Sequence, residues 1–373
     1  MLRKRGSPVG ESVGGSVDGR RLLLVGTYTP DSDPPGEGEG MYRVWFDPET
    51  GEMTDGGVAA RTPGPSFLAF HADPPTVYAV NERAEGTLTA FRVDGDASLA
   101  ELGSVPTGGG SPCHVLDLGS SVGVANYANG TATVFALGAD GTPQAGGRGF
   151  PHTGSGPVTD RQEGPHAHSL AVAPDGESLL VVDLGTDELR VHRAGEPAGA
   201  VALPPGTGPR HAVVAGEYVY VAGELDSRVH VLRWDGQAGT AEHLGSVHAT
   251  GEEAAGTNFP GEVAAHGGYV YVSNRGADAV STLAVRDGGA RLEHVANTVV
   301  GAWPRNFAVV RGHRSEPDHL VVAAQNGDSL ASLLIDPGTG VPADTGHRLE
   351  IPVPVCVLPV PINRIRRAGA PTE

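Results

Sequence analysis

The chain has 373 residues, of which 56 are glycine and 30 are proline, and its formal net charge at pH 7 is −18. This charge disfavours nucleic acid and anionic membrane surfaces as partners, because both would repel it, and no apolar run reaches transmembrane length. Lys4 is the only lysine, so the body of the chain has neither a Schiff-base lysine nor the lysine of a Walker-type phosphate loop.

The two ends are predicted to be disordered tails, residues 1–20 and 363–373, with a single domain at 21–362 between them. The N-terminal segment starts with basic residues but has no apolar stretch after them, so it lacks the pattern of a signal peptide. We therefore expect a cytoplasmic protein, a monomer or weak homo-oligomer, without metal or cofactor. Cys113 and Cys356 lack CxxC or zinc-type spacing, and two reduced thiols are favoured over a disulfide.

In chain order, the first elements are two predicted strands at 22–29 and 41–47, rich in leucine, valine and aromatic residues. A short apolar phrase then recurs along the chain, at irregular spacings of roughly fifty residues. Its copies lie at 65–70, 112–116, 167–172, 209–214, 260–264, 304–309 and 354–358. A repeat of this size in a chain of strands is typical of a β-propeller.

Each phrase is followed by a β-branched and aromatic run, then by an alternating run, then by a weaker fourth strand. Examples of the second and third strands are 76–81 with 86–94, and 218–223 with 228–235. Four antiparallel strands make one blade, so the predicted fold is an all-β, seven-bladed β-propeller. The first blade lacks its own opening phrase, and the copy at 354–358 is predicted to close the ring beside 22–29.

A long glycine-rich connection at 138–164 contains His152, Asp160 and Arg161 and leads into the phrase around His168. Loops of this length in compact domains are often functional lids. A disordered insertion is the equal alternative.

The candidate site follows from blade geometry. The first strand of a blade lines the central channel, and the second strand runs antiparallel to it. The start of the first strand and the end of the second therefore lie at the same mouth of the channel. Polar residues occupy both kinds of position: Ser66, Cys113, His168, Arg210 and Arg305 at first-strand starts, and Glu82, Tyr127, Asp183, Glu224, Arg275 and Gln325 at second-strand ends. Arginines, a histidine and acids at one mouth predict an active site.

Structural roles are the alternative for each residue. In this alternative, His168 is a core histidine. Arg210 and Arg275 then form salt bridges between blades with Glu224 and Asp183. His114 and His211 stand one residue past the channel position and are expected to be structural. The remaining candidates, with substrate binding as the expected role, are His166, Arg305, Glu82, Glu262 and Gln325.

The chemistry is narrowed by what the sequence lacks. It contains no HExxH motif. A Gly-x-Ser-x-Gly run at 119–123 leads into a predicted strand rather than the helix of a nucleophile elbow, which leaves serine-nucleophile hydrolysis unsupported. A carboxylate or imidazole that activates water, with arginines that bind an anion and stabilise an oxyanion, suits the attack of water on an ester.

The phrases together resemble the lactonase family of seven-bladed propellers, which includes bacterial 6-phosphogluconolactonases. The resemblance spans residues 22–360. It rests on a series of short motifs in order: 26–29, 78–82, 111–114, 124–127, 166–169, 182–187, 208–211, 224–227, 272–276 and 304–307.

The resemblance implies a catalytic set, because a fungal relative that interconverts carboxymuconate and its lactone has a proposed site in matching motifs. The matching residues here are His168, Arg210, Glu224 and Arg275. It also implies hydrolysis of 6-phosphogluconolactone, an anionic sugar lactone of the pentose phosphate pathway, without a metal. Either Glu224 or His168 is then the base, and the two arginines hold phosphate or carboxylate. The alternatives are a cycloisomerase acting on a muconate-like diacid and a non-catalytic propeller that binds a ligand or partner.

Overall fold

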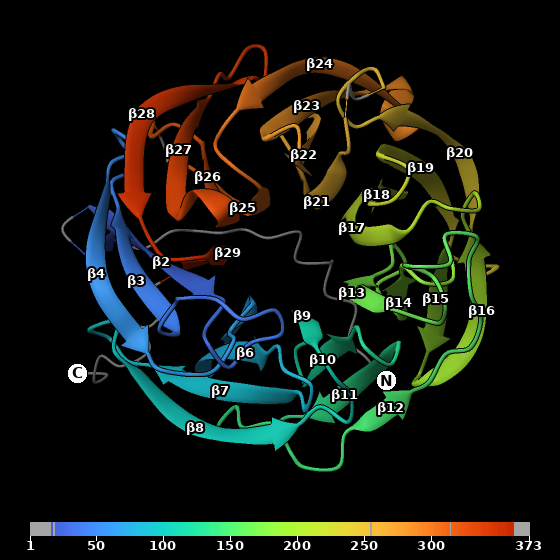
Figure 1. Ribbon diagram of the computed structural model, residues 1–373, viewed down its shortest axis with the longest axis horizontal. Helices are drawn as coiled ribbons and strands as arrows, with labels where there is room; N and C mark the ends of the chain where they lie inside the picture. The colour runs from blue at the N-terminus through green and yellow to red at the C-terminus, as the bar shows by residue number, and fades with distance from the viewer. Residues whose placement is uncertain (1–15, 18, 254–255, 314, 362–373) are drawn as a thin grey trace.

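The computed structural model describes residues 16–17, 19–253, 256–313 and 315–361. Within these residues the strands form seven antiparallel sheets arranged as blades around one axis (Figure 1). This confirms the predicted propeller. Each recurring phrase forms the innermost strand of its blade.

Six of the blades, numbered two to seven, each consist of four consecutive strands. Blades two and three are β5 (Phe67–Ala72), β6 (Pro75–Asn81), β7 (Thr87–Val93), β8 (Leu99–Pro106), and β9 (Pro112–Asp117), β10 (Ser121–Asn126), β11 (Thr131–Ala136), β12 (Arg148–Phe150). Blades four and five are β13 (Ala167–Val172), β14 (Ser178–Asp183), β15 (Glu188–Arg193), β16 (Glu196–Ala202), and β17 (Pro209–Ala215), β18 (Tyr218–Gly223), β19 (Arg228–Asp235), β20 (Thr240–His248). Blades six and seven are β21 (Phe259–His266), β22 (Tyr269–Arg275), β23 (Ala279–Arg286), β24 (Arg291–Val299), and β25 (Pro304–Val310), β26 (His319–Ala324), β27 (Ser329–Ile335), β28 (Pro342–Glu350). Short 3-10 turns, Asp287–Gly289 and Gln325–Gly327, follow β23 and β26.

Blade one is assembled from both ends of the chain, as predicted. Its strands are β2 (Arg20–Thr27), β3 (Met41–Phe46), β4 (Met53–Ala60) and β29 (Pro354–Val360). The C-terminal β29 is the innermost strand and pairs antiparallel with β2, from Leu22 opposite Val360 to Thr27 opposite Pro354. This pairing leaves no free inner edge in blade one and closes the ring.

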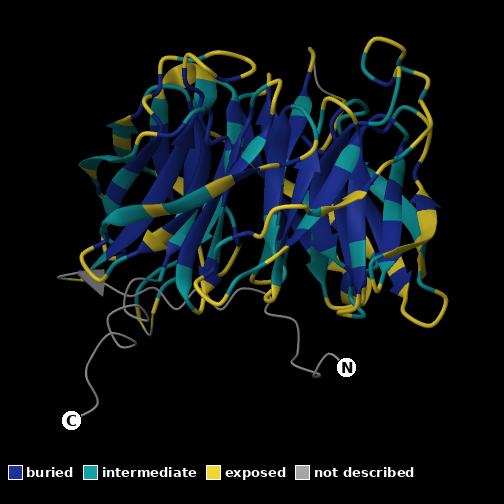
Figure 2. Cartoon of the chain, turned by 90° about the horizontal axis from the view of Figure 1, so that it is seen from below, coloured by how far each residue is buried: buried dark blue, intermediate teal, exposed yellow. Residues whose placement is uncertain are grey.

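The apolar core lies between blades rather than at the axis. Buried side chains of each neighbouring pair of blades form one cluster, and the described residues make seven such clusters. In the side view the buried residues fill the middle of the strands, and exposed residues concentrate in the turns at the two faces (Figure 2). Because every blade contributes to two clusters, the loss of one blade or inner strand would expose the apolar faces of its neighbours.

Buried tyrosines join three pairs of blades by the same contact. The hydroxyls of Tyr78, Tyr220 and Tyr271, each on a second strand, donate to carbonyl oxygens in outer turns of the next blade. The acceptors are Gly141, Gly289 and Gly340, at 2.7, 2.9 and 2.8 Å respectively, and all three glycines have positive φ. The sequence repeat therefore carries polar as well as apolar contacts between blades.

Two segments outside the main strands of the blades are described, one of them in part. The two-residue strand β1 (Ser16–Val17) pairs with Arg20 and Arg21 through a turn at Gly19, inside the segment expected to be a tail. The connection at 138–164 is not a disordered insertion, because it contributes β12 and then crosses to blade four. Residues 1–15 and 18 of the N-terminal segment, and the whole of the C-terminal segment 363–373, lie outside the described residues.

The described residues also answer two smaller questions. Cys113 on β9 and Cys356 on β29 are free and buried, as expected. No described helix has the length and apolarity needed to cross a bilayer.

Candidate active site

β-Bulges at the start of the innermost strands create the site. Where β13 pairs with β14, Ala167 and Ser169 face consecutive partners and His168 is left unpaired between them. The same shift leaves Arg210, Arg305 and Cys113 unpaired. A bulge re-aims the extra side chain and leaves the rest of the strand in phase, so these residues escape the alternation that packs their neighbours between blades.

The second strands supply a matching set of positions. The last residues of β6, β10 and β14 are Asn81, Asn126 and Asp183, and Asn274 is the last but one of β22. All four are buried and bind backbone or hydroxyl groups of nearby segments. They are structural, including Asp183, which the sequence placed at the mouth. The residue at the next position differs in chemical type from blade to blade. These residues are Tyr28, Glu82, Tyr127, Leu184 and Glu224, with Arg275 and Gln325 at the corresponding places in blades six and seven.

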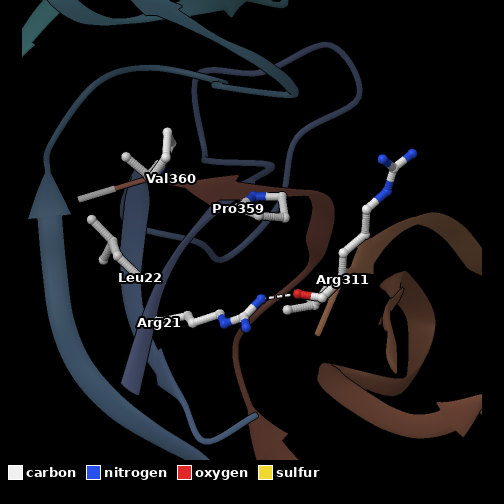
Figure 3. A pocket seen from close by; sticks show the side chains of 7 residues that line it. Arg21, Leu22, Arg311, Pro359 and Val360 are labelled. Carbon is white, nitrogen blue, oxygen red and sulfur yellow. Dashed lines mark hydrogen bonds between the residues drawn. The ribbon is translucent and has the colours of Figure 1, made fainter. Parts of the chain in front are cut away.

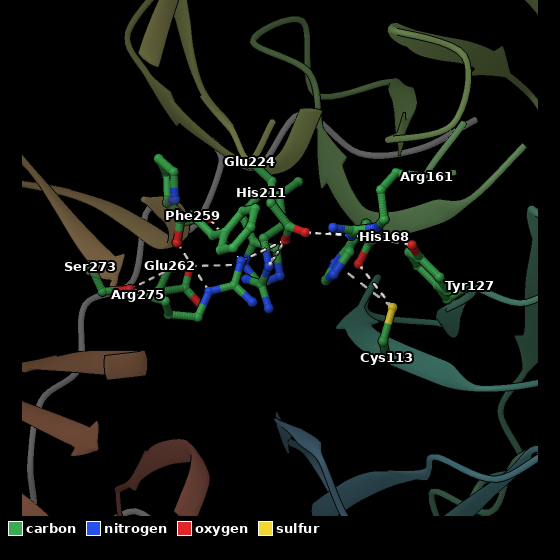
Figure 4. A network of polar contacts seen from close by, with 12 residues as sticks. Cys113, Tyr127, Arg161, His168, His211, Glu224, Phe259, Glu262, Ser273 and Arg275 are labelled. Carbon is green, nitrogen blue, oxygen red and sulfur yellow. Dashed lines mark hydrogen bonds and ion pairs between the residues drawn. The ribbon is translucent and has the colours of Figure 1, made fainter. Parts of the chain in front are cut away.

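Glu224 is the centre of a cluster of arginines (Figure 4). Its Oε2 atom accepts a hydrogen bond of 2.6 Å from Arg275 Nη2 and lies 3.1 Å from Arg210 Nε. Its Oε1 atom accepts a hydrogen bond of 2.6 Å from Arg161 Nη2. Arg210, Arg275 and Glu224 are buried, whereas the Arg161 side chain is 34% exposed. Three guanidinium groups therefore share one carboxylate.

The charges of this cluster do not balance. Burial alone would raise the pKa of Glu224, but Arg275, Arg210 and Arg161 outweigh it and hold that pKa well below the usual range. Burial, with the charges of Arg275 and Arg305, lowers the pKa of Arg210, whose Nη1 is buried without a hydrogen bond. Buried guanidinium N–H groups without a hydrogen-bond partner are costly, so the cluster has an unmet capacity for an anion.

His168 lies beside this cluster as a neutral imidazole. Its Nδ1 is 3.8 Å from Cys113 Sγ, and its ring stands edge-on to Tyr127 at 5.7 Å between centroids. Burial, followed by the charge of Arg210, holds the pKa of His168 well below its ordinary value. Burial also raises the pKa of the Cys113 thiol, so Cys113 is a neutral neighbour and not a nucleophile.

Glu82 and Arg305 occupy blades two and seven beside Tyr28 of blade one. The Tyr28 hydroxyl donates to Glu82 Oε1 at 3.0 Å, and Arg305 Cζ lies 5.2 Å from the centre of the Tyr28 ring. Glu82 Oε2 is buried and makes no hydrogen bond to the described residues. Glu82 and Arg305 thus form a second polar group of the site, with Tyr28, which sequence reasoning did not select.

Glu262 contacts a histidine and an asparagine instead of the arginine cluster. Its Oε1 lies 3.1 Å from His211 Nδ1, and its Oε2 accepts a 2.6 Å hydrogen bond from Asn306 Nδ2. The ring of His211 packs edge-on against those of His114 and His168, at 5.4 and 5.3 Å. Glu262 is therefore engaged in supporting the histidines.

His166 and Gln325 are the last two of the expected binding residues, and they too lie outside the arginine cluster. Both His166 ring nitrogens have partners, Tyr127 O at 2.9 Å and Glu163 Oε1 at 3.1 Å, and its ring stacks on Tyr127. The Gln325 side chain makes no hydrogen bond or ion pair to the cluster in the described part of the chain, because Gln325 begins a 3-10 turn. His166 thus positions Tyr127.

Comparison with known proteins places this geometry in a family. The model of the family described as "Lactonase, 7-bladed beta-propeller" matches residues 22–359. The chain belongs to this lactonase family. A 6-phosphogluconolactonase of Bacillus subtilis is 30% identical over 349 residues, which cover 89% of this chain and 96% of the relative.

Solved structures of the same family agree. A periplasmic gluconolactonase of Pseudomonas aeruginosa is 30% identical with a TM-score of 0.82, covering 92% of this chain and 99% of its own. A protein from Lactobacillus plantarum is 30% identical with a TM-score of 0.83, covering 91% of this chain and 99% of its own. Several relatives of similar identity carry no assigned activity.

Arg161, like Tyr28, is a residue of this lactonase-family site that was not among the candidates selected from the sequence. It lies in the long connection, which reaches from blade three across to blade five, and its Nη2 also lies 3.4 Å from the Tyr127 hydroxyl. Gln162 anchors the loop by donating to Leu184 O and Asp187 Oδ1, both at 2.8 Å. The length of the connection, with an arginine next to a histidine-containing phrase, was the available signal.

Two hollows elsewhere on this lactonase-family propeller are lined by residues outside the candidate site. One is a cavity of about 20 Å³ beside Arg21, Leu22, Val310 and Arg311, where the Arg21 guanidinium donates to Arg311 O (Figure 3). That volume holds about one water molecule. The other is an open hollow of about 690 Å³ over β19 and β20, lined by Trp234 and exposed charged residues. A candidate metal centre is likewise not found among the described His, Cys, Asp and Glu side chains.

Proposed function

We propose that this lactonase-family chain hydrolyses a sugar lactone that carries an anionic group, with 6-phospho-D-glucono-1,5-lactone as the leading substrate. The observation that carries the proposal is the sharing of one buried carboxylate, Glu224, by three arginines. In a chain of net charge −18, a buried excess of positive charge at one mouth favours an anionic ligand. Planar guanidinium groups suit phosphate and carboxylate oxygens.

Glu224 is a poor general base in this arrangement. Both of its oxygens accept from guanidinium groups, and its pKa is held well below the usual range by the arginines. A carboxylate stabilised in this way has little affinity for a proton. We assign it instead to positioning Arg161, Arg210 and Arg275.

His168 is the better base, because its imidazole is neutral at physiological pH. It would take a proton from the water that attacks the lactone carbonyl, while Arg210 stabilises the developing oxyanion. The arginine charges that depress the pKa of His168 are the same charges that a bound phosphate would neutralise. Substrate binding is therefore expected to raise the pKa of His168 and make it a stronger base.

The relatives support lactone hydrolysis but differ in substrate. One is a 6-phosphogluconolactonase and another is a gluconolactonase. The two substrates differ only by the phosphate group, which is the group that the arginine cluster would recognise.

The test is acid release from freshly prepared 6-phosphogluconolactone and from gluconolactone, each corrected for spontaneous hydrolysis. We expect acceleration of both, with a kcat/KM at least tenfold higher for the phosphorylated lactone, since one charge-assisted interaction is worth about 1.5–3 kcal/mol. Equal values would remove phosphate recognition from the proposal. No acceleration of either lactone would refute the hydrolase.

A further inference from the structure

Opening a lactone requires two proton transfers, and the residues assigned above account for one. His168 accepts a proton from water, but the ring oxygen that leaves the carbonyl carbon needs a proton from elsewhere. Arginine is too weak an acid to supply it. The inference that follows rests on the proposed lactone hydrolysis and concerns the missing donor.

Blades two and five carry the same backbone device. Glu82 follows β6 and Glu224 follows β18, and each donates its backbone N–H to a glycine that precedes the innermost strand of its blade. The distances are 2.9 Å to Gly64 O and 2.8 Å to Gly208 O. Both glycines have positive φ, 49° and 56°. The repeat therefore delivers two glutamates to equivalent positions of one ring.

The surroundings of the two carboxyl groups are opposite in character. Glu224 is bound by three arginines, whereas Glu82 forms no ion pair within 4 Å of a described side chain and receives one neutral hydrogen bond, from Tyr28. The second oxygen, Oε2, is buried without a partner. An unpartnered buried oxygen at a polar site is the place where a proton can reside or be exchanged with a ligand.

The expected protonation states follow this difference. Burial raises the pKa of Glu82, more than the charge of Arg305, the nearby but unbonded Ser66 hydroxyl and the hydrogen bond from Tyr28 lower it. Burial also raises the pKa of Tyr28, so its hydroxyl remains a donor. Two carboxyl groups whose environments separate their pKa values are the usual arrangement for an acid that must hold its proton near neutral pH.

We propose that Glu82 is the general acid of this site and protonates the ring oxygen as the lactone opens. The water oxygen bonds to the carbonyl carbon and its proton goes to His168. The bond between that carbon and the ring oxygen breaks, and the proton on Glu82 Oε2 passes to the ring oxygen, which becomes a hydroxyl. A proton then returns from His168 to Glu82 through solvent, and the product acid ionises.

The first test is the substitution Glu82→Gln, which keeps the shape of the side chain. We expect kcat for lactone hydrolysis to fall by about 10²- to 10⁴-fold, the range for loss of a general acid, with KM changed less than threefold. Glu242→Gln, an equal change in an exposed ion pair of the outer strand β20, is the matched control and should keep both constants. Thermal unfolding of each variant verifies that the ring remains folded.

The second test is the pH profile of kcat, which separates an acid from a structural residue. The wild-type rate should fall as the pH rises through the pKa of Glu82, and Glu82→Gln should abolish this limb. Tyr28→Phe removes a hydrogen bond that favours the ionised form, so the limb should move to higher pH. If kcat of Glu82→Gln stays within threefold of wild type, or if its rate still falls at high pH as in wild type, the role of Glu82 is overturned but the hydrolase is not. Wild-type protein that accelerates neither lactone overturns the hydrolase and the acid together.

Discussion

Arg161 and Glu224 form an ion pair of 2.6 Å although 63 residues separate them in the chain. The pair joins a loop that leaves blade three to the end of a strand in blade five. Of the three arginines on Glu224, Arg161 has the most exposed side chain, at 34% against 3% for Arg210 and 7% for Arg275. It is therefore the guanidinium that an entering substrate meets with the least rearrangement.

Arg161→Ala should weaken recognition of the anionic group. We expect KM for 6-phosphogluconolactone to rise about 10- to 100-fold, since a charge-assisted hydrogen bond is worth about 1.5–3 kcal/mol, and KM for gluconolactone to change less than threefold. Arg233→Ala, which breaks an exposed ion pair on β19, is the control and should alter neither. An equal rise for both lactones would show that Arg161 only shapes the loop.

Arg210→Ala should have a larger effect than Arg161→Ala, because Arg210 is buried and its charge acts on both His168 and Glu224. We expect kcat to fall for both lactones, because the oxyanion loses its stabilising charge. We expect KM to rise far more for the phosphorylated than for the neutral lactone, because the cluster that would bind phosphate also loses that charge. Loss of its positive charge should also raise the pKa of His168. The acidic limb of kcat/KM against pH should therefore move to higher pH, and a limb that stays in place would contradict the assignment of His168 as base.

Glu224→Gln should destabilise the fold, because it leaves three guanidinium groups without a carboxylate. Removing one partner of a buried pair costs about 3–5 kcal/mol, measurable as a lower midpoint in urea. The pKa of Glu224 is depressed in the folded state, so its contribution is present above the unfolded value of about 4.3 and declines as the pH falls below it. The stability gap between wild type and Glu224→Gln should narrow below that pH, and a gap independent of pH would refute this origin.

Tyr271→Phe tests the hydrogen bonds between blades. The Tyr271 hydroxyl donates to Gly340 O at 2.8 Å in the next blade, and its loss should reduce the free energy of unfolding by about 1 kcal/mol. Tyr269→Phe, at a neighbouring tyrosine whose hydroxyl makes no hydrogen bond within the described residues, should change stability less. Equal losses would indicate that ring packing, and not the hydroxyl, joins the blades.

Truncation before Pro354 tests ring closure. It removes β29, and with it Cys356 and Val360 from the cluster between blades one and two and Val357 from the cluster between blades one and seven. The loss should abolish the single cooperative transition in calorimetry. A truncated chain that melts cooperatively at the full-length temperature would show that the ring does not depend on closure.

Much of the site was accessible from the residue order because the propeller is a repeat. His168, Arg210, Glu224 and Arg275 were selected from their places in the phrase and in the strand after it, and the structure brings all four together. Glu262 and His166 were selected in the same way but are held by His211, Asn306 and Tyr127. Position along a strand indicates which mouth a residue approaches, but it does not indicate which partner the side chain will find.

The sequence by itself determined the number of blades, the closure by the last strand and the mouth that collects polar residues. These features follow from a local strand pattern and its period, which residues near one another in the chain encode. Only the tertiary structure decided that Arg161 reaches Glu224, that Tyr28 binds Glu82, and that bulges re-aim Cys113, His168, Arg210 and Arg305. The physical reason is that these contacts join residues of separate blades. The partners that set the charge and protonation of each side chain therefore come together only when the ring has closed.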